Sequence, residues 1–165
     1  MPALHPLVPG ALAPSLLAEL SDRAAAAAHH AYAPYSRFRV GAAILLAEPH
    51  EGHIVTGCNV ENASFRLTTC AEQTAIASAV AALGPGIRLR AVAVANLNQA
   101  ASMPCGACRQ TLLEFSPDPA AVTILFPGEP DSTGSPAPQA CTLADLLPAA
   151  FRLRPDPCTP DPLQP

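Results

Sequence analysis

Proline limits what this chain can fold into more than any other residue. The sequence contains 20 prolines, and each of them fixes φ and removes a backbone N–H donor. Three of them, Pro34, Pro85 and Pro117, follow apolar runs at helical spacing and mark points beyond which a helix cannot continue. The chain is therefore predicted to consist of short elements that alternate between these breaks.

Half of the prolines lie towards the C-terminal end, within 127–165. The stretch 128–139 has the composition of a turn or loop. Residues 153–165 are predicted to be a proline-rich tail that cannot form a helix, and residues 1–13 a loose leader. The folded unit is then expected to be one domain over 14–152.

Hydrophobic periodicity predicts the order of the elements between these ends. Apolar residues at helical spacing favour helices, and β-branched apolar runs favour strands. The predicted helices are 15–33, 70–83, 105–115 and 143–147, and the predicted strands are 38–47, 54–58, 89–95 and 121–126. Two β-α-β units follow an initial hairpin, which indicates an α/β sandwich with a partly parallel sheet.

Composition narrows the classes of function. Half of the residues are hydrophobic, which excludes a wholly disordered chain, and no apolar run reaches the roughly 18 residues of a membrane span. All nine cations are scattered arginines and the net charge is −4, so we expect no nucleic acid polymer as a partner. Residues 1–10 lack the cations of a secretory signal, and a soluble protein of the cytoplasm is expected.

Two cysteine motifs carry the strongest chemical signal. One is Cys-Ala-Glu at 70–72, the other is Pro-Cys-Gly-Ala-Cys at 104–108, and each begins a predicted helix. Free N–H groups and the positive end of the helix dipole stabilise thiolates there. Three thiolates leave the fourth position of a tetrahedral zinc ion open for water, which is the catalytic arrangement. Glu72 is then expected near that water without binding the metal.

Each motif alone has weaker explanations. A single Cys-x-x-Cys pair also occurs as a redox pair, as part of a structural zinc site or by coincidence. Together, and with a proline directly before the second motif, the two match the zinc deaminase signature with cysteine in place of histidine. The predicted zinc ligands are Cys70, Cys105 and Cys108. Cys58 is expected to be a small buried residue, and Cys141 and Cys158 are assigned no role.

Four longer segments extend the match beyond the cysteines. They are 33–43 (APYSRFRVGAA), 57–77 (GCNVENASFRLTTCAEQTAIA), 104–113 (PCGACRQTLL) and 146–151 (LLPAAF). In this order, across 15–151, the chain resembles the small homotetrameric cytidine deaminases. The resemblance implies a three-layer α/β/α sandwich with a mixed five-stranded sheet, one Zn²⁺ per subunit and a homotetramer.

The same resemblance implies roles for single residues. The three cysteines would hold zinc, and Glu72 would carry protons. The residues that it places against the nucleoside are Phe38, Asn59, Glu61, Ala63, Phe65, Ala71 and Phe151. Asn59 and Glu61 would hydrogen-bond the ribose 3′-hydroxyl, and Phe151 would stack on the cytosine bound to a neighbouring subunit.

Two positions depart from the family pattern. Relatives with three cysteine ligands usually carry arginine after Cys-Ala-Glu, where it hydrogen-bonds a ligand sulfur, whereas this chain has Gln73. Glutamine donates a hydrogen bond without a charge, which leaves Arg109 or Arg66 as candidates to compensate. The second position is usually tyrosine and is Phe65 here, which keeps the ring and loses the hydroxyl.

The predicted function is therefore zinc-dependent hydrolysis of cytidine and deoxycytidine to uridine and deoxyuridine, with release of ammonia, in pyrimidine salvage. Two alternatives stay open. A deaminase of blasticidin-S-like aminonucleosides shares the zinc motifs, although Asn59, Glu61 and Phe151 favour cytidine. A non-catalytic, zinc-stabilised binding protein would need no Glu72 and would fill the fourth zinc position.

Overall fold

A computed structural model describes residues 12–130, 132 and 136–153 of the chain. The strands among them are β1 (Val40–Leu46), β2 (Ile54–Cys58), β3 (Leu89–Asn96), β4 (Thr123–Pro130) and β5 (Pro136–Thr142). The helices are α1 (Pro14–Ala28), the short 3₁₀ helix η1 (Phe65–Leu67), α2 (Ala71–Leu83), α3 (Gly106–Glu114) and α4 (Leu143–Leu146). Most of the predicted leader and tail, with Cys158, lies outside the described residues. No helix within them is long and apolar enough to cross a membrane.

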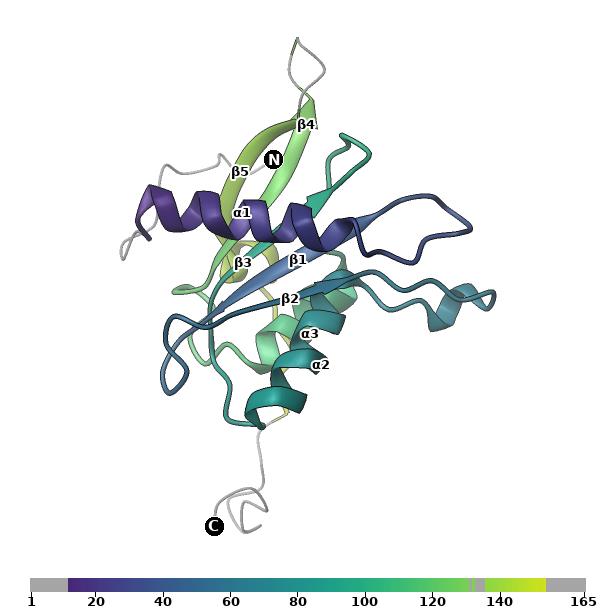
Figure 1. Cartoon of the computed structure of the whole chain (residues 1–165). Coiled ribbons are helices and arrows are strands. Elements are labelled where there is room, and N and C mark those ends of the chain that lie inside the picture. Colours follow the sequence, from purple (N-terminus) through teal and green to yellow (C-terminus); the bar gives the residue numbers. More distant parts are fainter. Residues whose placement is uncertain (1–11, 131, 133–135, 154–165) are drawn as a thin grey trace.

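The five strands form one sheet in the order β2-β1-β3-β4-β5. β3 and β4 pair in parallel, and the other neighbours pair antiparallel, so the sheet is mixed. Helix α1 crosses one face of the sheet, while α2 and α3 lie on the other (Figure 1). The predicted α/β sandwich with a mixed five-stranded sheet is confirmed.

Strand β1 is buried on both faces because it lies inside this sandwich. Ala42, Ile44 and Leu46 join the core on the side of α2 and α3, and Ala43 and Leu45 join the core under α1. A strand covered on both faces needs no polar alternation. This explains the continuous apolar run in the sequence.

The topology brings two helix starts to one edge of the sheet. β2 and β3 run in the same direction, because each pairs antiparallel with β1. α2 follows β2 and α3 follows β3 along the chain. Both helices therefore begin near the edge where these two strands end, which is where α/β sheets place their ligands.

The first helix ends earlier than predicted, at Ala28 rather than at residue 33. The reason is tertiary: the backbone N–H of Tyr32 donates to the carbonyl of Asn59 at 3.0 Å. The Tyr32 carbonyl in turn accepts from the N–H of Glu61 at 2.8 Å. Pairing with this distant segment pulls the chain out of the helix before Pro34 is reached.

The prediction of a loop over 128–139 is wrong at both ends. β4 continues to Pro130, and β5, which hydrophobic pattern alone did not predict, begins at Pro136. Proline pairs with proline across the ladder, as in Pro127 with Pro138. Prolines are tolerated because β5 is the edge strand of the sheet, where the ladder needs fewer donors.

Candidate active site

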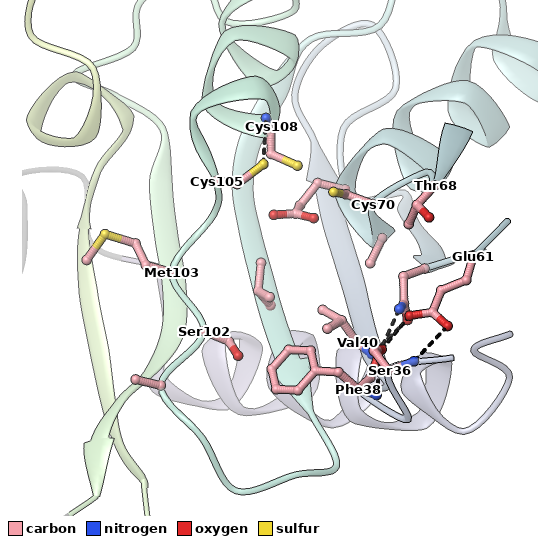
Figure 2. Close-up of a pocket in the computed structure, with 15 residues that line it drawn as sticks. Ser36, Phe38, Val40, Glu61, Thr68, Cys70, Ser102, Met103, Cys105 and Cys108 are labelled. Atoms are coloured by element: carbon pink, nitrogen blue, oxygen red, sulfur yellow. Dashed lines mark hydrogen bonds between the residues drawn. The ribbon is translucent and has the colours of Figure 1, made fainter. Parts of the chain in front are cut away.

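Three cysteine side chains meet where α2 and α3 begin. Cys70 is the N-cap residue of α2, Cys105 is the N-cap residue of α3, and Cys108 lies in the first turn of α3. Their Sγ atoms all lie within 4.8 Å of one another. Figure 2 shows the three sulfurs gathered at one end of the pocket. The predicted placement of both motifs at helix starts is confirmed.

The donor chemistry of this cysteine triad suits zinc. Three soft sulfur ligands with the spacing of a tetrahedral face favour Zn²⁺ over hard cations. The backbone N–H of Cys108 donates to Cys105 Sγ at 3.4 Å, which helps to stabilise charge on that sulfur. The triad therefore fits one zinc ion per chain and leaves one coordination position free.

Without a cation the sulfurs share protons. A hydrogen bond with Cys108 lowers the pKa of the Cys70 thiol to about 7. The same bond, together with burial, raises the pKa of Cys108. A cation that binds all three as thiolates takes the place of these shared protons.

Glu72 is the buried carboxyl of the site. It lies in the first turn of α2, is only 4% exposed and lines the same pocket as the three cysteines. Burial raises the pKa of its carboxyl above the ordinary value. A carboxyl in such a setting can hold a proton and release it, as a general acid–base group must.

These groups line one cavity of about 440 Å³, which is within the range of small-molecule sites. Of the predicted nucleoside contacts, the cavity contains Phe38, Asn59, Glu61 and Ala71. Sequence reasoning missed the remaining lining residues, which are Ser36, Val40, Thr68, Val94, Ala101, Ser102 and Met103. A usable signal existed for the last three, because they immediately precede the second cysteine motif.

Glu61 is fastened to the loop before β1. Its carboxylate accepts the hydroxyl of Ser36 and the backbone N–H groups of Tyr35 at 2.9 Å and Ser36 at 3.2 Å (Figure 2). The Ser36 hydroxyl is the main reason that the pKa of Glu61 lies below its ordinary value. A carboxylate offers about four acceptor positions, so one is left for a ligand hydroxyl.

Asn59 holds the start of β1 in place. Its Oδ1 accepts from the backbone N–H of Val40 and its Nδ2 donates to the carbonyl of Phe38, both at 2.9 Å. This clasp fixes the backbone of Phe38, whose ring lies in the cavity (Figure 2). One donor hydrogen and one lone pair of the amide remain for a ligand.

Several predicted residues lie outside the cavity. Ala63 is exposed, and the side chains of Phe65 and Phe151 are 73% and 70% exposed. The ring of Phe65 contacts that of Tyr35 edge-on, with centroids 5.8 Å apart. The described part of this chain therefore brings the zinc and acid–base groups together, but not these two aromatic rings.

The candidates to compensate the thiolate charge are placed as follows. Gln73 is half-buried on α2 and makes no hydrogen bond within the described residues, and Arg66 is exposed on η1. Arg109 donates to the carbonyls of Pro104 at 2.7 Å and Leu146 at 2.9 Å. Its third hydrogen bond, at 3.2 Å, goes to Met103 Sδ, so none of its three acceptors belongs to the cysteine triad.

Comparison with known proteins agrees with this geometry. Residues 15–124 match the family described as the cytidine and deoxycytidylate deaminase zinc-binding region. The chain belongs to this family. The family's zinc-binding character and the cysteine triad thus point to the same metal.

Members of the family are similar over most of the chain. A cytidine deaminase of Mycobacterium tuberculosis (strain H37Rv) is 46% identical over 127 residues, covering 77% of this chain and 90% of that protein. A cytidine deaminase of Sporosarcina psychrophila is 42% identical over 127 residues, covering 76% and 83%. The crystal structure of cytidine deaminase from Burkholderia pseudomallei has a TM-score of 0.67 at 41% identity, covering 81% of this chain and 98% of that one.

Proposed function

We propose that this chain hydrolyses cytidine and deoxycytidine to uridine and deoxyuridine, with release of ammonia, as an enzyme of pyrimidine salvage. One observation carries the proposal: the cysteine triad and the buried carboxyl of Glu72 line the same cavity as Asn59 and Glu61. Metal chemistry and sugar-binding groups thus face one ligand-sized space. The relatives named as cytidine deaminases support the same reaction.

The three cysteines would hold Zn²⁺, which supplies a Lewis acid that lowers the pKa of a water molecule towards neutrality. Glu72 accepts the proton of that water and passes it to N3 of the ring, which makes C4 electrophilic. The water oxygen joins C4 and the bond from C4 to the amine nitrogen breaks. Glu72 delivers a proton to the amine, so that ammonia leaves.

The sugar is bound at the other group of polar residues. A ribose hydroxyl both donates and accepts, and Glu61 and Asn59 each keep hydrogen-bonding capacity after their contacts to the protein. Phe38 packs against the nucleoside, and the backbone at Ala71 and Ala63 meets the base. The 2′-position is left to solvent in this assignment, which suits both cytidine and deoxycytidine.

The working enzyme is a homotetramer in this proposal. Phe151 and Phe65 act on the substrate of a neighbouring subunit, which accounts for large apolar rings that are exposed in a single chain. Leu67 beside them is 65% exposed, and Tyr35 packs on Phe65. A continuous apolar surface of this kind favours association over solvent exposure.

The enzyme acts in the cytoplasm on a free nucleoside. Its three metal ligands must be thiolates, and a reducing compartment keeps thiols in that form. A neutral nucleoside needs no basic surface, in line with a net charge of −4.

Gln73 makes the zinc less well compensated than in relatives with arginine there, without abolishing activity. The test is Gln73→Arg, for which we expect a kcat equal to or above that of the parent enzyme at equal zinc content. A large loss of kcat with zinc retained contradicts this assignment.

The decisive experiment follows the ultraviolet absorbance of cytidine during incubation with the purified chain and with Glu72→Ala, each at measured zinc content. We expect turnover by the parent chain and none by Glu72→Ala, although both bind zinc. Zinc binding without turnover supports a zinc-stabilised binding protein instead. Deamination of blasticidin S but not of cytidine selects the aminonucleoside enzyme.

A further inference from the structure

Phe151 lies in a segment that has no regular structure of its own. Residues 147–153, here called the C-terminal strap, follow α4 without forming a helix or strand. The Phe151 side chain is 70% exposed and that of Leu153 is 83% exposed. Side-chain burial therefore does not fix the ring, and whatever orients it must act through the backbone.

Two hydrogen bonds hold this backbone against α3. Gln110 Nε2 donates to the carbonyl of Phe151 at 2.9 Å. The guanidinium of the next residue, Arg152, donates to the carbonyl of Ser116 at 2.6 Å. Ser116 is fully buried, and its hydroxyl donates to the Leu112 carbonyl at 2.7 Å, so the acceptor for Arg152 is itself fixed.

The beginning of the strap is attached to the same helix. Arg109, the neighbour of Gln110, donates to the carbonyl of Leu146 at 2.9 Å. α3 thus holds both ends of a short stretch of chain, and it also carries Cys105 and Cys108 in its first turn. One rigid element connects the metal ligands of a subunit to its exposed aromatic ring.

We infer that Gln110 and Arg152 are positioning residues that present Phe151, in a fixed orientation, to the substrate site of a second copy of this chain. The inference rests on the proposed function, since it takes Phe151 to act on a neighbouring subunit. It adds a source of order: the ring is set by hydrogen bonds to its own backbone from α3. A ring held in this way loses little conformational freedom when substrate binds.

The kinetic test is a double-mutant cycle between positions 110 and 151. Gln110→Leu removes the donor, and we expect a KM for cytidine about three- to tenfold higher with kcat within about twofold of the parent. Phe151→Ala raises KM, and adding Gln110→Leu to it has no further effect. The control is Glu114→Leu, one turn further along α3, because Glu114 is exposed and makes no hydrogen bond or ion pair within the described residues.

The outcomes separate clearly. A KM for Gln110→Leu equal to that of Glu114→Leu overturns the inference. Effects of Gln110→Leu and Phe151→Ala that multiply in the double variant also overturn it, because Gln110 then acts elsewhere. Gln110→Glu keeps the shape and removes the donor, so it replaces Gln110→Leu if the leucine variant does not fold.

A second measurement needs no turnover and so remains valid if the proposed function fails. The chain contains no tryptophan, and Phe151→Trp introduces a single fluorescent indole at the strap. We expect the anisotropy of this indole to fall and its quenching by acrylamide to rise when Gln110→Leu or Arg152→Gln is added. Unchanged anisotropy and quenching contradict the inference whether or not the enzyme deaminates cytidine.

Discussion

The backbone of Gly57 in β2 lies directly against the first turn of α2, at the carbonyl of Ala71. A β-carbon on Gly57 would stand 2.6 Å from that carbonyl oxygen and 2.3 Å from the backbone nitrogen of Ala75. Both are backbone atoms, so no side-chain rotation relieves the clash. Ala71 lies between Cys70 and Glu72, and the contact therefore sets how deep a zinc ligand and the buried carboxyl lie above the sheet.

We predict that Gly57→Ala displaces the start of α2 and weakens the zinc site. Overpacking commonly costs about 1–3 kcal/mol, and a backbone clash belongs at or above the upper end of that range. The measurements are the free energy of unfolding in urea and the zinc content per chain. Gly86→Ala is the control, because a β-carbon there meets nothing within 4 Å. Full zinc and parental stability in Gly57→Ala contradict the prediction.

Arg109 is predicted to hold the second cysteine motif in place by bridging carbonyls. It joins Pro104, directly before Cys105, to Leu146 at the end of α4. Lysine cannot reproduce this planar fork, so Arg109→Lys should lower the free energy of unfolding by about 1–3 kcal/mol. Arg23→Lys is the matched control, since Arg23 forms an exposed ion pair with Glu19 that contributes little. Equal stabilities of the two variants argue against a structural bridge.

Local signals predicted the parts of this fold that local chemistry decides. The cysteine motifs at two helix starts, the breaker at Gly84 and the apolar strands are readable from neighbouring residues. Strand β5 and the early end of α1 are set by pairing with distant segments, through the ladder with β4 and the bonds of Tyr32. Hydrophobic pattern carries no record of such pairing, which is why both were mispredicted.

The candidate site divides in the same way. Its metal ligands and Glu72 follow from spacing within two short motifs. The anchoring of Glu61 by Ser36 joins residues 25 apart, and the clasp of Asn59 on Phe38 joins residues 21 apart. These contacts depend on how β1 and β2 pair, so only the folded chain shows them.

Acid should reveal the bond between Ser36 and Glu61. The bond lowers the pKa of Glu61, so the carboxylate is fully charged above its ordinary pKa and loses this stabilisation as pH falls through the lowered value. Ser36→Ala moves the pKa of Glu61 up towards the ordinary range. We expect the KM for cytidine to begin rising at a higher pH in Ser36→Ala than in the parent enzyme, measured from about pH 7 down to about pH 4. Ser21→Ala, on the surface of α1, should follow the parent curve; coincident curves for Ser36→Ala and Ser21→Ala contradict the prediction.

Thiol reactivity should distinguish a metal ligand from a buried cysteine. Cys105 is exposed, so zinc rather than burial would protect it. Burial, with a smaller contribution from Asp145, raises the pKa of Cys141 to about 11, which leaves it protonated near pH 8. We expect iodoacetamide to modify Cys105 only after a chelator removes zinc and to leave Cys141 unmodified, as read by peptide mass spectrometry. Equal alkylation of Cys105 with and without zinc means that Cys105 is not a ligand.

Phe65 offers a position where one added hydroxyl group should improve substrate binding. The ring is 73% exposed and is oriented by its edge-on contact with Tyr35, so Phe65→Tyr adds a hydroxyl at a defined place without disturbing the core. In the homotetramer that hydroxyl reaches the substrate of a neighbouring subunit and stays away from the reacting C4. We therefore expect the KM for cytidine to fall by about three- to tenfold while kcat stays within about twofold. An unchanged KM, in a variant that keeps its zinc and its assembly, means that position 65 does not contact the substrate in this enzyme.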